Sequence, residues 1–268
     1  MLVVPPNIKV RGARLELTFS RQGDTTIISS QWSASPLKIW RPFEVGSGRI
    51  LVQIVNVSPG IMAGDDYRLE LKVQPGAKVV VVNQSATKLH SMPGGCEAKQ
   101  TVLIQVEDDA ELEYYPGLTI PFPNTDYVQR VEVSLAQRAR FAMLERYAVG
   151  RVERGEVHRY RKVSSLVRVT RDRKPIYADG LELKEGVGLL DGHAYVASGV
   201  FCWGESSKPE NLQTESMLLV SGQGANEVSY LRALGKNGLE LKTSLDDFVN
   251  TWRSEQGLEA VVFSRFSS

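Results

Sequence analysis

Strict alternation of apolar and polar residues marks several stretches of the chain as β-strands. The clearest case runs through residues 67–74, where the two kinds of side chain alternate without exception as YRLELKVQ. A period of two places one set of side chains in a core and the other in water. A tight turn at residues 74–77 then reverses the chain, so the pattern predicts a strand, a turn and a second strand.

This strand–turn–strand unit recurs along the sequence. Ala77, Ala110 and Ala139 occupy the same place in three successive units, at offsets of 33 and 29 residues. A period near 30 residues is typical of stacked supersecondary units, each too small to bury its apolar face alone. We therefore predict a mainly β, single-domain protein of stacked strands, similar to a β-helix. Three ordinary hairpins of one β-sandwich would give a similar alternation, and this alternative stays open.

The apolar period changes near the C-terminus. Residues 227–234 place apolar side chains at helical spacing, with Gly235 as a stop signal. Residues 244–247 (SLDD) have the form of an acidic capping box before a helix that contains Phe248 and Trp252. The pattern predicts two short C-terminal α-helices, which cover an open end of the β stack, dock a partner, or do both.

Composition bounds the class of protein. The chain has 268 residues, 42% hydrophobic and 24% charged, which is typical of a soluble globular domain. We expect one domain over residues 1–268, with a β stack in 1–224 and a helical region in 225–268. The apolar runs are too short to span a membrane, and the N-terminus lacks a secretory pattern. These features predict a cytoplasmic protein without a membrane partner, in which Cys96 and Cys202 are free thiols.

Charge is unevenly distributed along the chain. Residues 130–174 contain 13 Arg or Lys against 5 Asp or Glu, while the whole chain has a net charge of only +1. This segment is either a docking face for an acidic partner or a set of solvated strand faces. It contains no recognition-helix, zinc-finger or RNP pattern and no regularly spaced aromatics, so we predict no nucleic-acid partner. A basic nucleic-acid-binding module stays as a third interpretation.

The usual catalytic motifs are absent from the sequence. It contains no phosphate-binding loop, no H-E-x-x-H, no paired C-x-x-C and no G-x-S-x-G. We therefore predict a protein that is not an enzyme and has no tightly bound cofactor. Stacked β proteins that act on polysaccharides provide the main alternative, with Asp65, Asp66 and Glu113 as candidate carboxylates on one face.

Two groups of side chains could bind a metal ion. His90, Met92 and Cys96 lie within seven residues and offer an imidazole, a thioether and a thiol to a borderline or soft cation. The alternative is an ordinary turn around residues 93–95. Asp65 and Asp66 follow a glycine loop and could provide oxygen ligands or a general acid and base; the alternative is a solvated turn.

Several motifs follow one another in a characteristic order and spacing. They are SPLK (35–38), RPF (41–43), the loop 60–65, QSATK (84–88), LEYYP (112–116), IPF (120–122), Gln129, Gly150-Arg151, Gly155-Glu156 and the closing helix 245–253. Together these motifs resemble the urease accessory protein family UreD, also called UreH, while Pro59, Ala63 and Asn83 depart from the family pattern.

This resemblance implies a non-enzymatic scaffold with a β-helix-like fold. Such a protein binds UreF, which in turn holds the GTPase UreG, and the assembly delivers nickel to apo-urease. The ion is thought to cross the UreD-like subunit transiently through an internal, water-lined passage. A chain without a phosphate-binding loop agrees with GTP hydrolysis on another subunit.

The physics of passage favours carboxylates and hydroxyls over the His90–Cys96 group. Nickel binds imidazole and thiolate tightly, whereas a conduit must also release its ion. The candidate residues for the nickel passage are Asp65, Thr87 and Glu156, with Arg151 as a gate or a structural partner.

We also expect the C-terminal region to dock the UreF-like partner. Trp252 is the candidate anchor and Phe248 lies on the same helical face, although core packing would equally explain both aromatics. Truncation after residue 224 should then abolish binding and leave the β core folded.

Overall fold

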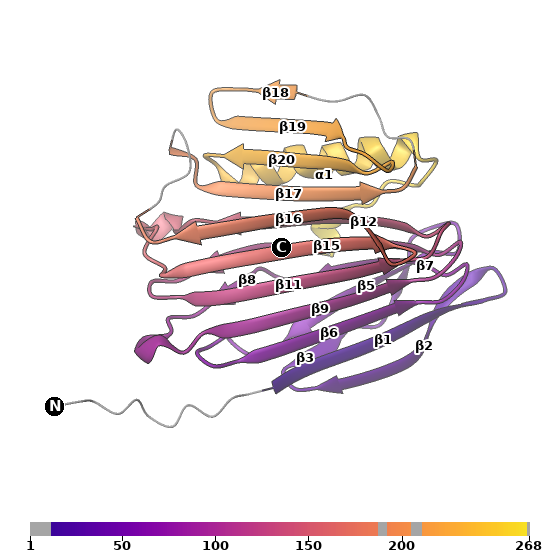
Figure 1. Ribbon diagram of the computed structural model, residues 1–268, viewed down its shortest axis with the longest axis horizontal. Helices are drawn as coiled ribbons and strands as arrows, with labels where there is room; N and C mark the ends of the chain where they lie inside the picture. Colours follow the sequence, from indigo (N-terminus) through magenta and orange to yellow (C-terminus); the bar gives the residue numbers. More distant parts are fainter. Residues whose placement is uncertain (1–11, 187–191, 205–210, 267–268) are drawn as a thin grey trace.

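The computed structural model describes residues 12–186, 192–204 and 211–266 and stacks their strands into two facing sheets (Figure 1). One sheet has seven strands in the order β16-β15-β11-β9-β6-β1-β2. Its strands are β1 (Gly12–Gln22), β2 (Thr25–Ala34), β6 (Asp66–Val73), β9 (Ala98–Val106), β11 (Asp126–Leu135), β15 (Lys162–Arg171) and β16 (Lys174–Lys184).

The other sheet has eleven strands. Nine follow the order β18-β19-β20-β17-β12-β10-β7-β5-β3, while β4 pairs with β5 and β8 with β10. They are β3 (Leu37–Ile39), β4 (Phe43–Glu44), β5 (Ile50–Asn56), β7 (Lys78–Asn83), β8 (Thr87–Leu89), β10 (Glu111–Pro121), β12 (Arg140–Ala148), β17 (Tyr195–Cys202), β18 (Asn211–Gln213), β19 (Met217–Gln223) and β20 (Ser229–Gly235). A small ribbon joins β13 (Gly150–Arg151) to β14 (Glu156–Val157).

The central part of the chain winds back and forth between the two sheets. Of the strands from β6 to β12, β6, β9 and β11 are parallel neighbours in the first sheet, and β7, β10 and β12 are parallel neighbours in the second, where β8 follows β7. This winding is the stacked, β-helix-like architecture that the 30-residue period predicted.

The repeated alanines form one edge of the stack. Ala77, Ala110 and Ala139 are all buried, and backbone hydrogen bonds of 2.9 Å link each to the next unit, from Glu111 N to Ala77 O and from Arg140 N to Ala110 O. Overpacking a buried, closely packed position is destabilising, so a small side chain suits these stacked turns. The equal positions in sequence are therefore equal positions in space.

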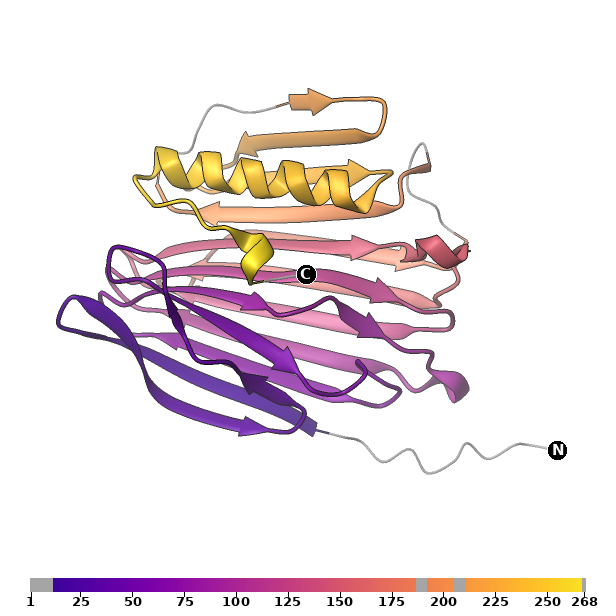
Figure 2. The ribbon, with the colours of Figure 1, turned by 180° about the vertical axis from the view of Figure 1, so that it is seen from behind.

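Helix α1 (Gly238–Glu255) covers the outer face of the eleven-stranded sheet (Figure 2). One apolar layer fills the space between the sheets, and a second lies between this outer face and α1. Trp252 belongs to the second layer, with its ring centroid 4.9 Å from that of Phe201 and 5.2 Å from that of Trp203. Within the described residues, no helix has the length and apolar character needed to cross a membrane.

The predicted helix at residues 227–234 is wrong. These residues enter β20, which pairs with β17 and β19, and its buried positions alternate with period two. The helical spacing of Leu231 and Leu234 was coincidental, because sheet pairing overrides a weak local preference. The second predicted helix exists but begins earlier: Asn237 Oδ1 accepts hydrogen bonds from the amides of Leu239 and Glu240, at 2.9 and 3.0 Å. A 3-10 turn at Phe263–Arg265 follows it.

Buried charges fasten α1 to the sheet. Arg253, in the last turn of α1, donates to both carboxylate oxygens of Glu113, and Arg49 donates to Glu111. Arg49 Nη1 also lies 3.2 Å from Glu113 Oε1. Glu113 is thus enclosed beneath α1, whereas Asp66 begins a strand of the other sheet. The carboxylates of the polysaccharide-enzyme interpretation do not share a face.

Candidate functional site

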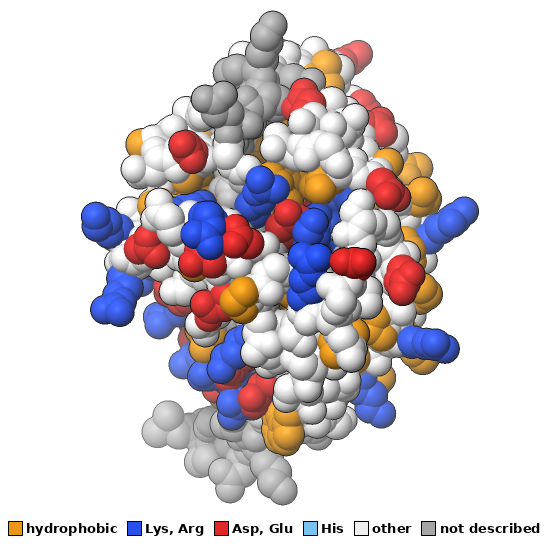
Figure 3. Space-filling model, turned by 90° about the vertical axis from the view of Figure 1, so that its right-hand side faces the viewer, with side chains coloured by type: hydrophobic (Ala, Val, Ile, Leu, Met, Phe, Trp, Pro, Cys, Tyr) orange, Lys and Arg blue, Asp and Glu red, His pale blue; other side chains and the backbone are white. Residues whose placement is uncertain are grey.

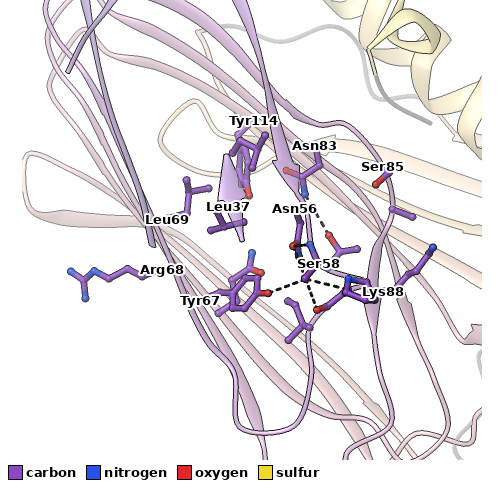
Figure 4. Close-up of a pocket in the computed structure, with 17 residues that line it drawn as sticks. Leu37, Asn56, Ser58, Tyr67, Arg68, Leu69, Asn83, Ser85, Lys88 and Tyr114 are labelled. Atoms are coloured by element: carbon purple, nitrogen blue, oxygen red, sulfur yellow. Dashed lines mark hydrogen bonds between the residues drawn. The ribbon is translucent and has the colours of Figure 1, made fainter. Parts of the chain in front are cut away.

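A cavity of about 170 Å³ opens near one end of the stack (Figure 4). Its wall combines aliphatic side chains with neutral amides and hydroxyls. Arg68 also borders the cavity, but Figure 4 shows its side chain directed away, and its Nε donates to Glu70 at 2.7 Å. The neutral polar side chains in the wall are those of Asn56, Ser58, Tyr67, Asn83, Ser85, Thr87, Gln100 and Tyr114, and the charged Lys88 also lines the cavity.

The glycine loop and the QSATK motif meet at this cavity. The amide of Ile61 donates to Lys88 O at 2.9 Å, and the amide of His90 donates to Ile61 O at 2.8 Å. Gly60 has a φ of 153°, and a Cβ there would lie 2.3 Å from Lys88 O. Only glycine permits this approach. Thr87 lies in the wall, with its Oγ1 3.5 Å from Asn83 Nδ2.

A row of polar side chains leads from the cavity into the interior. Tyr67, Gln100, Gln129 and Ser165 occupy one register position on four neighbouring strands, β6, β9, β11 and β15. The inward-facing residues of the next row are Leu69, Val102, Val131 and Val167. Gln100, in the cavity wall, donates to Gln129 Oε1 at 3.4 Å. The polar row therefore interrupts an otherwise apolar core.

Glu145 lies opposite this row, on β12 of the other sheet. Gln129 Nε2 donates to its carboxylate at 2.9 Å, the hydroxyl of Tyr147 at 3.0 Å and that of Ser165 at 3.2 Å. Only 3% of Glu145 is exposed. Burial raises the pKa of Glu145 to about 7, against hydrogen bonds from Tyr147 and Ser165 that lower it. The interior thus holds a carboxyl group that changes charge near neutral pH.

The polar row continues toward the far side of the stack. Glu145 pairs in register with Ser198 on β17, and Ser198 pairs with Arg232 on β20. Ser198 Oγ donates to Asp179 Oδ2 and accepts from Arg232 Nη1, both at 2.8 Å. Asp179 lies on the edge strand β16, so this group joins the two sheets where Arg232 reaches solvent.

The predicted passage residues have three different surroundings. Thr87 lines the cavity, as described above. Asp65 is buried, and its Oδ2 accepts the amide of Met62 at 2.8 Å, which closes a turn of the glycine loop. Glu156 forms a bidentate pair with Arg151, at 2.5 and 2.7 Å. The hydrogen bond from Arg151 holds the pKa of Glu156 below its usual value.

Arg151 also stacks over the ring of Phe122, with its guanidinium carbon 4.2 Å from the centroid. Of its two predicted roles, gate or structural partner, this geometry supplies the contacts of a structural partner.

The side chains of the predicted His90–Met92–Cys96 group have different surroundings in the structure. Met92 is fully buried and its sulfur accepts the amide of Asp126 at 3.3 Å. His90 packs on Phe122 with centroids 4.8 Å apart. Cys96 is half-buried, and Cys202 is buried with its thiol pKa raised to about 12 by desolvation. Within the described residues, no three His, Cys, Asp or Glu side chains gather as a metal site.

Acidic side chains compensate part of the charge of the basic segment 130–174. Figure 3 shows Lys and Arg interspersed with Asp and Glu where the strands turn. Arg138 forms a bidentate pair with Asp109, with both N···O distances at 2.8 Å. These contacts fit the interpretation of solvated, internally compensated strand ends.

The two aromatic docking candidates face the sheet. Trp252 is only 2% exposed and Phe248 is half-buried, with its ring centroid 6.0 Å from that of Phe201. Truncation after residue 224 would remove β20 and α1 and uncover the second apolar layer. Such a truncation would test folding instead of docking.

The sequence patterns did not single out Glu145, Gln100 or Ser165, although polar residues on the inward face could have indicated them. Gln100 and Gln129 are 29 residues apart, which equals one spacing of the alanine repeat, and Glu145 interrupts the apolar run FAMLERYA. A polar residue that recurs at the repeat period on the inward face indicates an internal polar ladder.

The stacked parallel strands define a β-solenoid-like protein. Its distinguishing feature is the row of buried polar side chains between the two sheets. The model of the family described as UreD urease accessory protein matches residues 11–266. The chain therefore belongs to the UreD urease accessory protein family.

Curated relatives agree with this assignment. The chain is 38% identical over 265 residues to urease accessory protein UreD 1 of Synechococcus sp. (strain JA-3-3Ab), covering 96% of this chain and 97% of that protein. It is 35% identical to urease accessory protein UreD of Deinococcus radiodurans, over 74% of this chain and 73% of that protein. Urease accessory protein UreH of Helicobacter pylori (strain J99) is 29% identical over 57% of each chain.

Proposed function

We propose that this protein is a cytoplasmic, non-enzymatic maturation factor for urease. It binds a UreF-like protein and, through it, the GTPase UreG, and it passes nickel to apo-urease. Membership of the UreD family supports the role in maturation. The observation that carries the nickel proposal is the buried polar row from the cavity to Glu145.

The chemistry of this row suits an ion in transit. Amide, hydroxyl and carboxyl oxygens bind nickel more weakly than imidazole or thiolate, so an ion can both enter and leave. Glu145 is held partly protonated by burial, and an arriving cation favours the ionised form. The carboxylate then offsets part of the electrostatic cost of a divalent ion in the interior.

Nickel is cargo in this account, and the residues of the row hold it in turn. Thr87, in the cavity wall, stays a proposed entry residue. Asp65 and Glu156, which lie in the two glycine loops, also stay proposed passage residues, with Arg151 as the partner of Glu156.

Reconstitution tests the proposed function. Purified chain, a UreF-like protein, a UreG-like GTPase, GTP and nickel are mixed with apo-urease, and urease activity is followed in time. We expect activation to require the chain and to be lost when GTP is omitted. Full activation without the chain, or failure of the chain to co-purify with the UreF-like protein and apo-urease, would contradict the proposal.

A further inference from the structure

The edge strands of the two sheets differ in how well they are protected against pairing with a strand of another chain. At the ends of the eleven-stranded sheet, β3 and β18 are only three residues long. Short length, charge and proline are the devices that keep an edge from adding another strand. On the seven-stranded sheet the edge strand β16 carries such residues, namely Lys174, Pro175, Asp179, Glu182 and Lys184.

The opposite edge of that sheet lacks these devices. β2 has ten residues, TTIISSQWSA, with no charge and no proline. A bulge at Ser29 divides it, because Thr18 of β1 pairs with Ser30 while Phe19 pairs with Ile28. The bulge leaves residues 30–34 as a regular, uncharged run along the free edge. Among the described edge strands, β2 is thus the long, unguarded one.

This run is exposed and carries a large aromatic side chain. Residues 30–33 are all exposed, and Trp32 is 51% exposed. The guanidinium of Arg14 lies 5.7 Å from the Trp32 ring centroid. Arg14 is itself neutralised by Glu16 at 2.6 Å and Glu70 at 3.0 Å. The edge therefore presents the exposed Trp32 ring in contact with Arg14, whose charge is neutralised by two glutamates.

We propose that residues 30–34 pair antiparallel with the same residues of a second copy, which joins two seven-stranded sheets edge to edge. A two-fold axis requires a patch to complement itself, and an uncharged strand does so without placing like charges opposite each other. With the axis at Trp32, the two indole rings are neighbours and residues 30 and 34 are paired. This dimer is independent of the proposed role in urease maturation.

Sedimentation equilibrium of the full chain over a wide range of concentrations tests the proposal. We expect a reversible monomer–dimer equilibrium in the wild type. Trp32→Lys and Trp32→Glu should each be monomeric, because like charges then face each other across the axis. Mixing these two variants should restore the dimer. Ala178→Lys, at the guarded β16 edge, is the matched control and should dimerise like the wild type.

Far-UV circular dichroism establishes that the variants fold. A wild type that stays monomeric throughout, or a Lys and Glu mixture with no more dimer than either variant, would overturn the proposal. Loss of binding to a UreF-like protein by the Trp32 variants of a monomeric chain would also overturn it, because the edge would then belong to that partner.

Discussion

Glu145 couples the protein's interior to pH. Its pKa is about 7 in the folded chain, above its ordinary value of 4.5, because burial disfavours the charged form. The folded state therefore holds this proton more tightly than the unfolded state. The contribution of Glu145 to the free energy of unfolding is greatest below pH 4.5 and is lost as the pH rises through 7.

We predict that the raised pKa of Glu145 lowers the free energy of unfolding of the wild type by about 3 kcal/mol as the pH rises from 4.5 to 7. This figure follows from about 1.4 kcal/mol per pKa unit. Glu145→Gln removes the titration. Urea unfolding at a series of pH values should show the difference between variant and wild type growing in the variant's favour with pH. Glu132→Gln, on the half-exposed outer face, should give no such trend. A pH-independent difference for Glu145→Gln would contradict the assigned pKa.

Sequence reasoning reached some of these residues and not others, for physical reasons. The glycine loop was correctly interpreted as a place of close backbone approach, because a Cβ at Gly60 would lie 2.3 Å from Lys88 O. Thr87 was named from a recognisable motif and lines the cavity, while its part in nickel passage stays a prediction. Glu145 was missed because its surroundings come from β11 and β15, which only the fold brings opposite β12.

At the scale of elements, the first prediction concerns the residue that caps α1. The sequence pattern predicted a cap at Ser244, whereas the structure places the cap at Asn237. Asn237→Ala should destabilise the protein by about 1 kcal/mol, because two helix amides lose their side-chain acceptor. Ser244→Ala, at the start predicted from sequence, should change stability by less than about 0.5 kcal/mol. Thermal unfolding of both variants measures this difference. Equal losses would indicate that the helix begins at Ser244 after all.

The attachment of α1 gives a second prediction. Glu113→Gln leaves Arg253 and Arg49 buried without their shared carboxylate and should cost about 3–5 kcal/mol. Adding Arg253→Met should recover part of this loss, because one unpaired charge is removed. Urea unfolding of the single and double variants gives the coupling energy. Additive losses would show that the two side chains do not act as a pair.

The elements that sequence predicted best are those with a repeated environment. The alanine turns were found because every unit stacks in the same way. β20 was assigned as a helix because its strand character depends on pairing with β17 and β19. Those partners lie in other parts of the chain, and apolar spacing within eight residues does not reveal them.

For the whole molecule, a periodic sequence yields a periodic interior. Winding the chain between two sheets places residues one repeat apart in contact, so one polar position per turn becomes a continuous row. The number of sheets and the covering of one by α1 could not be read from the period. They depend on which faces are apolar after folding.

Nickel transfer through the row is most directly tested with Glu145→Gln and the matched variant Glu132→Gln. The rate of nickel-dependent activation of apo-urease is measured with the UreF-like and UreG-like proteins present, after co-purification has established normal assembly. We predict a rate lower by about tenfold or more for Glu145→Gln, which corresponds to about 1.4 kcal/mol added to a barrier, and an unchanged rate for Glu132→Gln. Normal activation by a folded, assembled Glu145→Gln protein would contradict passage along this row.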